Sequence, residues 1–295
     1  MVLGQPGPVL NPTHRAAVLG SPIGHSLSPT LHRAGYAALG LRGWDYTAHE
    51  VDEGGLAPFV ADLDETWRGL SLTMPLKAAA FDVAEGVSDL AREAGAVNTL
   101  VRTSTGWSGD NTDVHGIVAA LRSAGVHRPR SATVIGAGAT ARSALLALRE
   151  IGVRGEVLVA ARDERKAGAL IEAMPDVHPD LGVVFLEGWW SETWPPAEVV
   201  ISTVPAGAAN AGVAGMLGRR GEHLMRGTTL LDVVYADWPT PLARAAAERG
   251  ASVVSGLEML VHQAARQFEL FTGTAAPVTV MQQAGRSALG HTPDA

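Results

Sequence analysis

The sequence predicts an α/β fold of two domains, an N-terminal α/β domain and a Rossmann-type, doubly wound domain. The length of 295 residues suits two domains, because one domain usually takes about 100–200 residues. Short β-like runs alternate with helical stretches from residue 16 onward. In the second half these runs are almost continuous in Val, Ile and Leu, which is typical of a parallel sheet covered on both faces.

The first half of the chain combines helix signals with four β-like runs. Ser28 is placed to cap a helix that ends at Gly40, and a second helix begins at Pro75. Asp113 is expected to cap a further helix. The expected strands are AAVLG, WDYTAHEV, GLSLTM and NTLVR.

The second half holds a longer series of strands and ends in a helix. The helix LEMLVHQAARQFELF is predicted to close the chain and return to the first domain, because the second sheet is complete without it. We expect domains at 1–117, with a flexible stretch at 1–14, and at 118–255, then a C-terminal helical segment at 256–295. The expected strands are SATVIGAG, GEVLVAAR, GVVFLEG, AEVVISTV, TTLLDVVY and ASVVSG.

Composition limits the function classes. The net charge of −7 argues against a nucleic-acid binder, which needs clustered Lys and Arg. The absence of cysteine excludes disulfides and thiolate zinc sites, and the histidine spacing matches no metal motif, so no metal is expected. No apolar run reaches the roughly 18–20 residues of a membrane span, and no signal peptide is evident. A cytoplasmic protein is expected, either a monomer or a homodimer.

The stretch VIGAGATARSALLAL has the form of a strand, a Gly-x-Gly-x-x-Ala turn and a helix. Gly136 permits the tight turn, Gly138 lets the backbone approach a pyrophosphate, and Ala141 allows close packing of helix on sheet. Amide groups at the helix start can then bind the phosphates. Because the turn opens a βαβ unit, it predicts a dinucleotide site rather than an ordinary glycine turn.

The end of the next strand favours NADP over NAD. An NAD enzyme usually carries an acid there for the ribose 2′-hydroxyl. Here Arg162 and Lys166 flank the place where a 2′-phosphate would sit, whereas Asp163 favours NAD. The same charges can also form an ordinary solvated helix start. NADP is therefore the favoured cofactor and NAD the weaker alternative.

Lysine is rare in this chain, which has only Lys77 and Lys166 among 23 basic residues. Lys77 is expected in the first turn of a helix, where the helix dipole opposes a cation by about 0.3–1 kcal/mol. An arginine could supply the charge there but could not give up a proton. We therefore expect Lys77 to take part in proton transfer, with Asp113 orienting it if the two lie together. The alternatives are a surface lysine and an ordinary helix cap.

Two further stretches have both a functional and a structural interpretation. GHSLSP places Ser26 and Ser28 ahead of a helix, either as a loop hydroxyl and a cap or as a carboxylate site. ISTVPAG follows a strand of the second domain and either borders a nicotinamide or only turns the chain.

Over about residues 15–285 the chain resembles the shikimate dehydrogenase family. The resemblance implies NADPH-dependent reduction of 3-dehydroshikimate to shikimate, in aromatic amino-acid biosynthesis, with Lys77 and Asp113 as the catalytic pair. It rests on motifs that occur in this order: GSPIGHSLSP, SLTMPLK, GAVNTLVR, GDNTDVHG, GAGATAR, VVYADWPTPL and GLEMLVHQA.

The resemblance also implies the binding residues. Those for shikimate would be Ser26, Ser28, Thr73, Asn98, Asp113 and Gln263, with Tyr235 nearby. Those for NADP would be Gly136, Ala137, Gly138, Ala139, Thr140, Ala141, Arg162, Lys166, Thr203, Val233 and Gly256. Many members have Asn where this chain has Ser71, and Thr where it has Asp163, so one substrate contact can differ and some NAD use is allowed.

Other functions stay open at this point. A quinate/shikimate dehydrogenase that prefers NAD is the nearest alternative, and the region 161–166 would distinguish it. A non-catalytic NADP-binding sensor would keep the glycine turn without needing Lys77, Asp113 and Gln263 together. A dehydrogenase acting on folates would explain the glycine turn but not GHSLSP. The stretch GWWSETWPP is interpreted only as packing of a variable loop.

Overall fold

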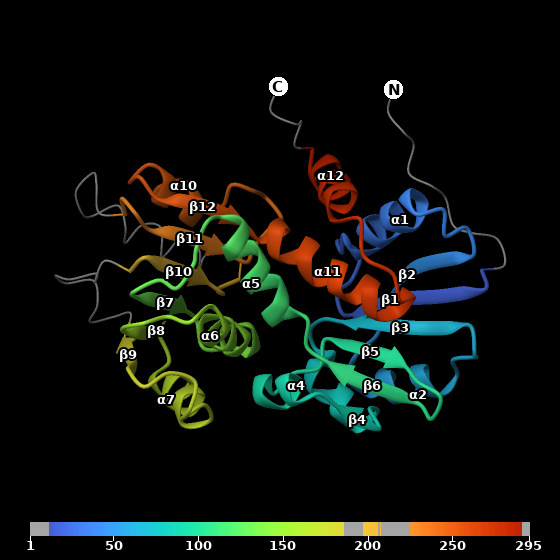
Figure 1. Ribbon diagram of the computed structural model, residues 1–295. Helices are drawn as coiled ribbons and strands as arrows, with labels where there is room; N and C mark the ends of the chain where they lie inside the picture. The colour runs from blue at the N-terminus through green and yellow to red at the C-terminus, as the bar shows by residue number, and fades with distance from the viewer. Residues whose placement is uncertain (1–11, 186–196, 206, 208–224, 291–295) are drawn as a thin grey trace. The chain divides into compact units, whose positions relative to one another are not determined.

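The computed structural model describes residues 12–185, 197–205, 207 and 225–290. They form two compact units, the first Met1–Gly116 with Leu260–Ala295 and the second Ile117–Met259. Within the described residues, each unit holds one six-stranded sheet (Figure 1). The tryptophan-rich GWWSETWPP and the leader as far as residue 11 lie outside the described residues.

The first unit is built on a mixed sheet in the order β2 (Trp44–Glu50), β1 (His14–Gly20), β3 (Trp67–Leu72), β5 (Thr99–Arg102), β6 (Trp107–Asp110) and β4 (Gly86–Val87). The strands β2, β1 and β3 are parallel, β5 is antiparallel to β3 and β6, and β4 is parallel to β6. Four of these strands were expected. The strands β4 and β6 were missed because they are short and carry few β-forming side chains.

The helices of the first unit depart from expectation in detail. The cap position of the first helix is occupied by Leu27, and Ser28 is the first helical residue, so the capping role expected of Ser28 is wrong. Gly40, with φ of +66°, follows this helix as expected. The helices are α1 (Ser28–Ala38), α2 (Leu56–Ala61), α3 (Leu76–Ala79), α4 (Asp89–Ala94) and α12 (Val278–Ala288), with 3₁₀ turns at Glu53–Gly55 and Ala80–Asp82.

Two helices, α5 (Asp113–Ser123) and α11 (Gly256–Thr272), each run from one unit into the other. From Leu260 onward the chain belongs to the first unit, which confirms the predicted return of the C-terminal helix. There α11 packs on β3, where a Cβ at Gly69 would overlap the ring of Phe271. Only glycine leaves room for this contact.

The sequence pattern predicted α11 as the last helix, but one more helix follows it. The additional helix α12 packs on α1. Its sequence starts with the β-branched residues Val278, Thr279 and Val280 and contains Gly285, all weak helix formers, so local propensity did not indicate it. Among the described helices, none is both long and apolar enough to cross a membrane.

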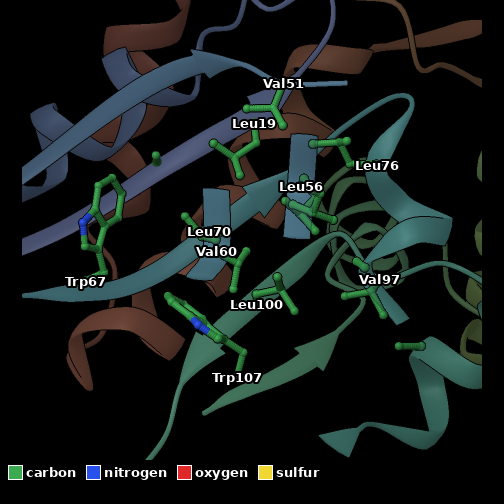
Figure 2. Close-up of a cluster of buried hydrophobic side chains, with 14 residues drawn as sticks. Leu19, Val51, Leu56, Val60, Trp67, Leu70, Leu76, Val97, Leu100 and Trp107 are labelled. Atoms are coloured by element: carbon green, nitrogen blue, oxygen red, sulfur yellow. The ribbon is translucent and has the colours of Figure 1, made fainter. Parts of the chain in front are cut away.

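A core of apolar side chains fixes β3 and β5 of the first unit. Figure 2 shows Leu70 of β3, Leu100 of β5 and Val60 of α2 pointing toward one another. Leu70 and Leu100 are fully buried, and each side chain of this kind contributes about 1.5–3 kcal/mol to folding. This packing fixes the strands whose ends carry Thr73 and Asn98.

The second unit is built on a parallel sheet in the order β12 (Ser252–Ser255), β11 (Thr229–Asp232), β10 (Val199–Ser202), β7 (Ala132–Ile135), β8 (Val157–Ala161) and β9 (Leu181–Phe185). All six were expected, and counted from β7 within this unit the order is 3-2-1-4-5-6, that of a dinucleotide-binding sheet. Figure 1 shows α6 (Ala139–Ile151) beside β7, α7 (Glu164–Glu172) beside β8 and β9, and α10 (Pro241–Ala247) beside β11 and β12.

A histidine is fully buried among aromatic rings in the first unit. His32 of α1 stacks on Tyr46, with 4.0 Å between the ring centroids. Neither ring nitrogen has a hydrogen-bond partner of ordinary geometry among the described residues. Burial lowers the pKa of His32 from 6.5 to about 3, and the interaction with the Gln267 side chain, which raises the pKa, is the smaller effect.

This burial predicts an acid-sensitive fold. Between pH 6.5 and about 3 the unfolded chain binds a proton at His32 that the folded protein does not. The free energy of unfolding therefore falls with decreasing pH, by up to about 1.4 kcal/mol per pH unit from this residue. Urea unfolding at pH 7 and pH 5 measures the loss. The variant His32→Phe keeps a ring but cannot titrate, so it should lose less stability. Parallel pH dependence in both proteins would contradict the prediction.

Candidate active site

Lys77 and Asp113, far apart in the sequence, form an ion pair in the first unit. Lys77 Nζ donates a hydrogen bond to Asp113 Oδ2 at 2.6 Å. The Asp113 side chain is 5% exposed, whereas the Lys77 side chain is 22% exposed. An ammonium has three donors, and this pair uses one of them. The pair thus combines a buried anion with a cation that can still reach a ligand.

The position of Lys77 is explained by this partner and not by a helix dipole. Lys77 is the second residue of α3, so it lies in the first turn of a helix as expected, but α3 has only four residues and its dipole is correspondingly small. The Lys77 carbonyl accepts the Val97 N–H at 2.9 Å, which ties α3 to the segment just before Asn98. Asp113 then receives an ammonium whose backbone is already fixed.

Asp113 is the first residue of α5 but does not cap it. The side-chain oxygen of Asn111 accepts the backbone N–H of Asp113 at 3.0 Å and that of Val114 at 3.4 Å. The capping role expected of Asp113 is therefore wrong, because Asn111 performs it. The Asp113 carboxylate accepts side-chain donors instead, from Lys77 at Oδ2 and from Asn98 at Oδ1.

Asn98, which directly precedes β5, holds the other carboxylate oxygen. Its Oδ1 accepts the backbone N–H of Thr112 at 2.8 Å, so its amino group must face Asp113. Its Nδ2 donates to Asp113 Oδ1 at 2.8 Å. Asn98 is itself 2% exposed. Lys77, Asp113 and Asn98 therefore form one hydrogen-bonded group, which we call the Lys77 group.

Three of the expected substrate residues lie on loops of the first unit or at the start of its first helix. Ser26 Oγ accepts the N–H of Ser28 at 3.3 Å, so Ser26, and not Ser28, satisfies a backbone donor at the start of α1. Thr73 follows β3, and its N–H donates to the Leu19 carbonyl at 2.9 Å. The Thr73 carbonyl also accepts the Leu76 N–H at 2.8 Å, which ties Thr73 to α3, the helix that holds Lys77.

Gln263 and Tyr235 come from different units. Gln263 lies on α11 in the first unit, and its side-chain oxygen is buried with no hydrogen-bond partner among the described residues. An unpaired buried carbonyl is costly unless a ligand supplies a donor. Tyr235 follows β11 in the second unit, where burial raises the pKa of its hydroxyl.

Three buried polar residues close to this group, Tyr46, Ser71 and Gln267, were not expected from sequence patterns. Tyr46 Oη donates to Ser71 Oγ at 2.6 Å, and Ser71 Oγ donates to Gln267 Oε1 at 2.8 Å. Ser71 had been noted only as a departure from the family pattern. Gln267 follows Gln263 by one helical turn, and this spacing could have indicated that both face the same side of α11.

The glycine turn of the second unit has no room for a side chain at its first glycine. Gly136 has φ of +115°, and a Cβ there would overlap Thr203 Oγ1. The hydroxyl of Thr203 also donates to the Ile135 carbonyl at 2.8 Å, so it supports the turn. Gly138 precedes α6, faces open space and caps that helix without a side chain. Ala141 is fully buried, and the other expected residues, Ala137, Ala139 and Thr140, complete the turn and the start of α6.

The acid after β8 has a structural role. Asp163 caps α7, its carboxylate accepting the Lys166 N–H at 3.1 Å. The side chains of Arg162 and Lys166 are both exposed beside it. Asp163, the acid that favoured NAD, thus accepts a backbone donor at the start of α7, and both cations are accessible.

Val233 and Gly256 lie together on the second unit. A Cβ at Gly256 would overlap the Val233 carbonyl, so the start of α11 approaches the end of β11 closely. The Val233 N–H donates to the Ser202 carbonyl at 3.0 Å, which places it beside the end of β10. Both residues therefore lie at the carboxyl edge of the sheet, where α/β sheets bind ligands.

A cavity of about 640 Å³ opens at the other edge of this sheet. Its lining includes Ser131, Val199 and Thr229, which are at or next to the amino ends of β7, β10 and β11. It contains none of the expected site residues. Because parallel sheets place their ligands at the carboxyl ends of the strands, this cavity is not the expected dinucleotide site.

Comparison with known proteins adds two family matches. The family described as shikimate dehydrogenase substrate binding domain matches residues 18–100. The family described as shikimate 5′-dehydrogenase C-terminal domain matches residues 256–284. Both matched segments contribute residues to the first unit.

Similar proteins cover nearly the whole chain. The shikimate dehydrogenase (NADP(+)) of Synechococcus sp. (strain JA-3-3Ab) is 36% identical over 96% of this chain and 96% of its own. The crystal structure of Mycobacterium tuberculosis shikimate dehydrogenase is 41% identical, with a TM-score of 0.84 over 93% of this chain and 99% of its own. The shikimate 5-dehydrogenase of Thermus thermophilus, in complex with NADP(H) and shikimate, is 33% identical, with a TM-score of 0.80 over 94% of this chain and 100% of its own.

The two glycines of the turn predict separable effects. Gly136→Ala should lower the free energy of unfolding by about 1–3 kcal/mol, because both its φ and the Thr203 hydroxyl oppose a Cβ. Gly138→Ala should keep the stability, since its Cβ meets open space, but should weaken dinucleotide binding about tenfold or more. Urea unfolding and NADPH fluorescence titration measure the two quantities. Equal loss of stability in both variants would contradict this account of the turn.

Proposed function

Because the chain belongs to the shikimate dehydrogenase family, we propose that it is an NADP-dependent oxidoreductase that reversibly reduces 3-dehydroshikimate to shikimate. The observation that carries the proposal is the Lys77 group, in which a buried carboxylate fixes a partly exposed ammonium. The reaction serves aromatic amino-acid biosynthesis. We propose that the enzyme works in the cytoplasm on this small molecule, as a monomer or homodimer, without nucleic acid or membrane.

The two units divide the binding between them in this proposal. The first unit, which contains the Lys77 group, binds shikimate, and the second unit binds NADP on its parallel sheet. The segments proposed for these roles are 1–117 with the C-terminal 256–295 and, for the cofactor, 118–255. The helices α5 and α11 connect the units covalently.

The residues of the second unit fit NADP. The open space at Gly138 and the start of α6, which has no side-chain cap, suit a pyrophosphate. Arg162 and Lys166 are exposed cations for a 2′-phosphate, and Asp163 is engaged in capping α7. When bound, NADPH supplies the hydride for the reduction. Thr203, Val233 and Gly256 are the proposed residues next to the nicotinamide end.

The residues of the first unit suit a polyhydroxy acid. Ser26 and Ser28 offer hydroxyls at the start of α1 for the substrate carboxylate. Thr73 and Asn98 offer side chains at the ends of β3 and β5, and Tyr235 of the second unit is a further proposed contact. The unpaired oxygen of Gln263 would accept a hydrogen bond from a substrate hydroxyl. These roles are assigned residue by residue from the family resemblance.

Lys77 moves the proton of the reaction in this proposal. As the carbonyl carbon gains hydride, its oxygen gains negative charge and takes a proton from the Lys77 ammonium, directly or through a water. In the direction of oxidation Lys77 takes the proton back. Asp113 accepts one Lys77 N–H and fixes the ammonium, and Asn98 holds the second oxygen of Asp113 in place.

Substitution of Lys77 tests the catalytic assignment. Lys77→Ala should lower kcat for shikimate oxidation by about 10²–10⁴-fold, because both charge stabilisation and proton transfer are lost. Lys77→Arg keeps the charge but cannot give up its proton, so it should recover only a small part of this loss. NADPH affinity should stay within about twofold in both variants. Turnover of Lys77→Ala within about fivefold of wild type would show that Lys77 is not catalytic.

The cofactor assignment is tested with shikimate and quinate, each with NADP and NAD at matched concentrations. Shikimate with NADP should give the highest rate. Arg162→Ala should raise KM for NADP about tenfold or more and change KM for NAD much less. Asp163→Asn is the matched control, since asparagine still caps a helix, and it should not weaken NADP use. Faster oxidation of quinate with NAD would identify the alternative quinate dehydrogenase, and no oxidation at all would favour a non-catalytic sensor.

A further inference from the structure

We propose that a buried chain of hydrogen bonds from Tyr46 to Asp113 positions the Lys77 group, with Tyr46, Ser71 and Gln267 as positioning residues. This inference deepens the proposed function and rests on it. The chain runs from Tyr46 through Ser71, Gln267, Thr99 and Asn98 to the carboxylate of Asp113. Every member is buried.

The direction of the chain follows from the amide of Gln267. Its Nε2 donates to the backbone carbonyl of Asn98 at 3.3 Å and to Thr99 Oγ1 at 2.9 Å. A carbonyl only accepts, so the amino group of Gln267 must face that side. The side-chain oxygen then faces Ser71 and can only accept there. Gln267 is thereby fixed in one orientation.

The same reasoning orders Ser71 and Tyr46. Because Gln267 Oε1 can only accept, the Ser71 hydroxyl must donate to it, at 2.8 Å. The Ser71 oxygen is then available to accept the hydroxyl proton of Tyr46, at 2.6 Å. Burial raises the pKa of Tyr46, so this hydroxyl keeps its proton and remains a donor.

At its other end the chain of hydrogen bonds reaches the carboxylate of Asp113. Thr99 Oγ1 accepts from Gln267, so its proton goes to Asn98 Oδ1 at 2.7 Å. That oxygen also accepts the Thr112 N–H, which leaves the Asn98 amino group for Asp113 Oδ1. All donors in the chain therefore point toward the carboxylate, whose other oxygen accepts from Lys77.

Through this chain Tyr46, Ser71 and Gln267 affect the Lys77 group. In a buried, low-dielectric site, successive hydrogen bonds that point the same way polarise and strengthen one another. They also hold the Asn98 amide in the one orientation that donates to Asp113. The chain links β2, β3, α11 and β5 to the first residue of α5, so the returning C-terminal helix becomes part of the support for Lys77.

The test removes the centre of the chain and then its far end. Gln267→Met keeps the length of the side chain but removes both polar ends. It should lower kcat for shikimate oxidation about tenfold, because a loosened carboxylate no longer fixes Lys77. KM for NADP should stay within about twofold, since no residue proposed to bind NADP belongs to the chain. Thermal unfolding, recorded in parallel, reports any general loss of stability.

Tyr46→Phe removes the first donor of the chain, together with the interaction of Tyr46 with the Ser28 side chain, and has a matched control in Tyr36→Phe. Both tyrosines belong to the same apolar cluster and are almost fully buried. The hydroxyl of Tyr36 has no hydrogen-bond partner among the described residues. Tyr46→Phe should lower kcat about threefold, and Tyr36→Phe should leave it unchanged. In the double variant of Tyr46→Phe with Gln267→Met, kcat should fall no further than in Gln267→Met alone.

The outcomes distinguish a role of the hydrogen-bond chain in positioning Lys77 from a role in folding alone. The proposal is overturned if Gln267→Met and Tyr46→Phe both keep kcat within about twofold of wild type, even if they unfold at lower temperature. Equal losses in Tyr46→Phe and Tyr36→Phe would overturn it as well. If Gln267→Met does not fold, the two tyrosine variants decide. A wild-type protein without activity on shikimate would contradict the proposed function instead, and crystal structures of wild type and Tyr46→Phe would then test whether Asn98 and Asp113 shift.

Discussion

The buried carboxylate of Asp113 is the constraint on which the site depends. A carboxylate that is almost wholly removed from water is stable only with charge-assisted hydrogen bonds to its oxygens. Here one oxygen accepts from Lys77 and the other from Asn98. The three residues lie on or beside α3, α5 and β5, which the first unit brings together around a packed core. The hydrogen bonds that stabilise the Asp113 carboxylate therefore fix both the Lys77 ammonium and the Asn98 amide.

Two acids at helix starts show how capping and chemistry are separated in this chain. At α5, Asn111 accepts the backbone donors, and Asp113 is left to bind Lys77 and Asn98. At α7, Asp163 accepts the backbone donor itself and is engaged in that role. The first arrangement supplies an anion to the proposed catalytic group. Arg162 and Lys166 are exposed cations beside β8, and such cations suit a phosphate.

Local sequence signals predicted most of the fold, and their failures have a common cause. The parallel strands of the second unit and the turn at Gly136 were predicted because apolar runs and a glycine turn are local patterns. Ser28 and Asp113 were assigned as caps from residue type alone, whereas Leu27 occupies the cap position of α1 and Asn111 accepts the backbone donors at the start of α5. The helix α12 and the strands β4 and β6 lack strong propensity and depend on their neighbours in space. Gln267 was missed because its partners lie 168 and 196 residues away in the sequence.

The central claim is that this chain moves a hydride between shikimate and NADP at the Lys77 group. Its most direct test is oxidation of shikimate that carries deuterium on the carbon bearing the 3-hydroxyl group, with NADP as acceptor. Mass spectrometry of the reduced cofactor should find the deuterium on the nicotinamide ring, and the rate should be slower than with unlabelled shikimate if hydride transfer limits turnover. Reduced cofactor without the label, or no reduced cofactor at all, would contradict the account.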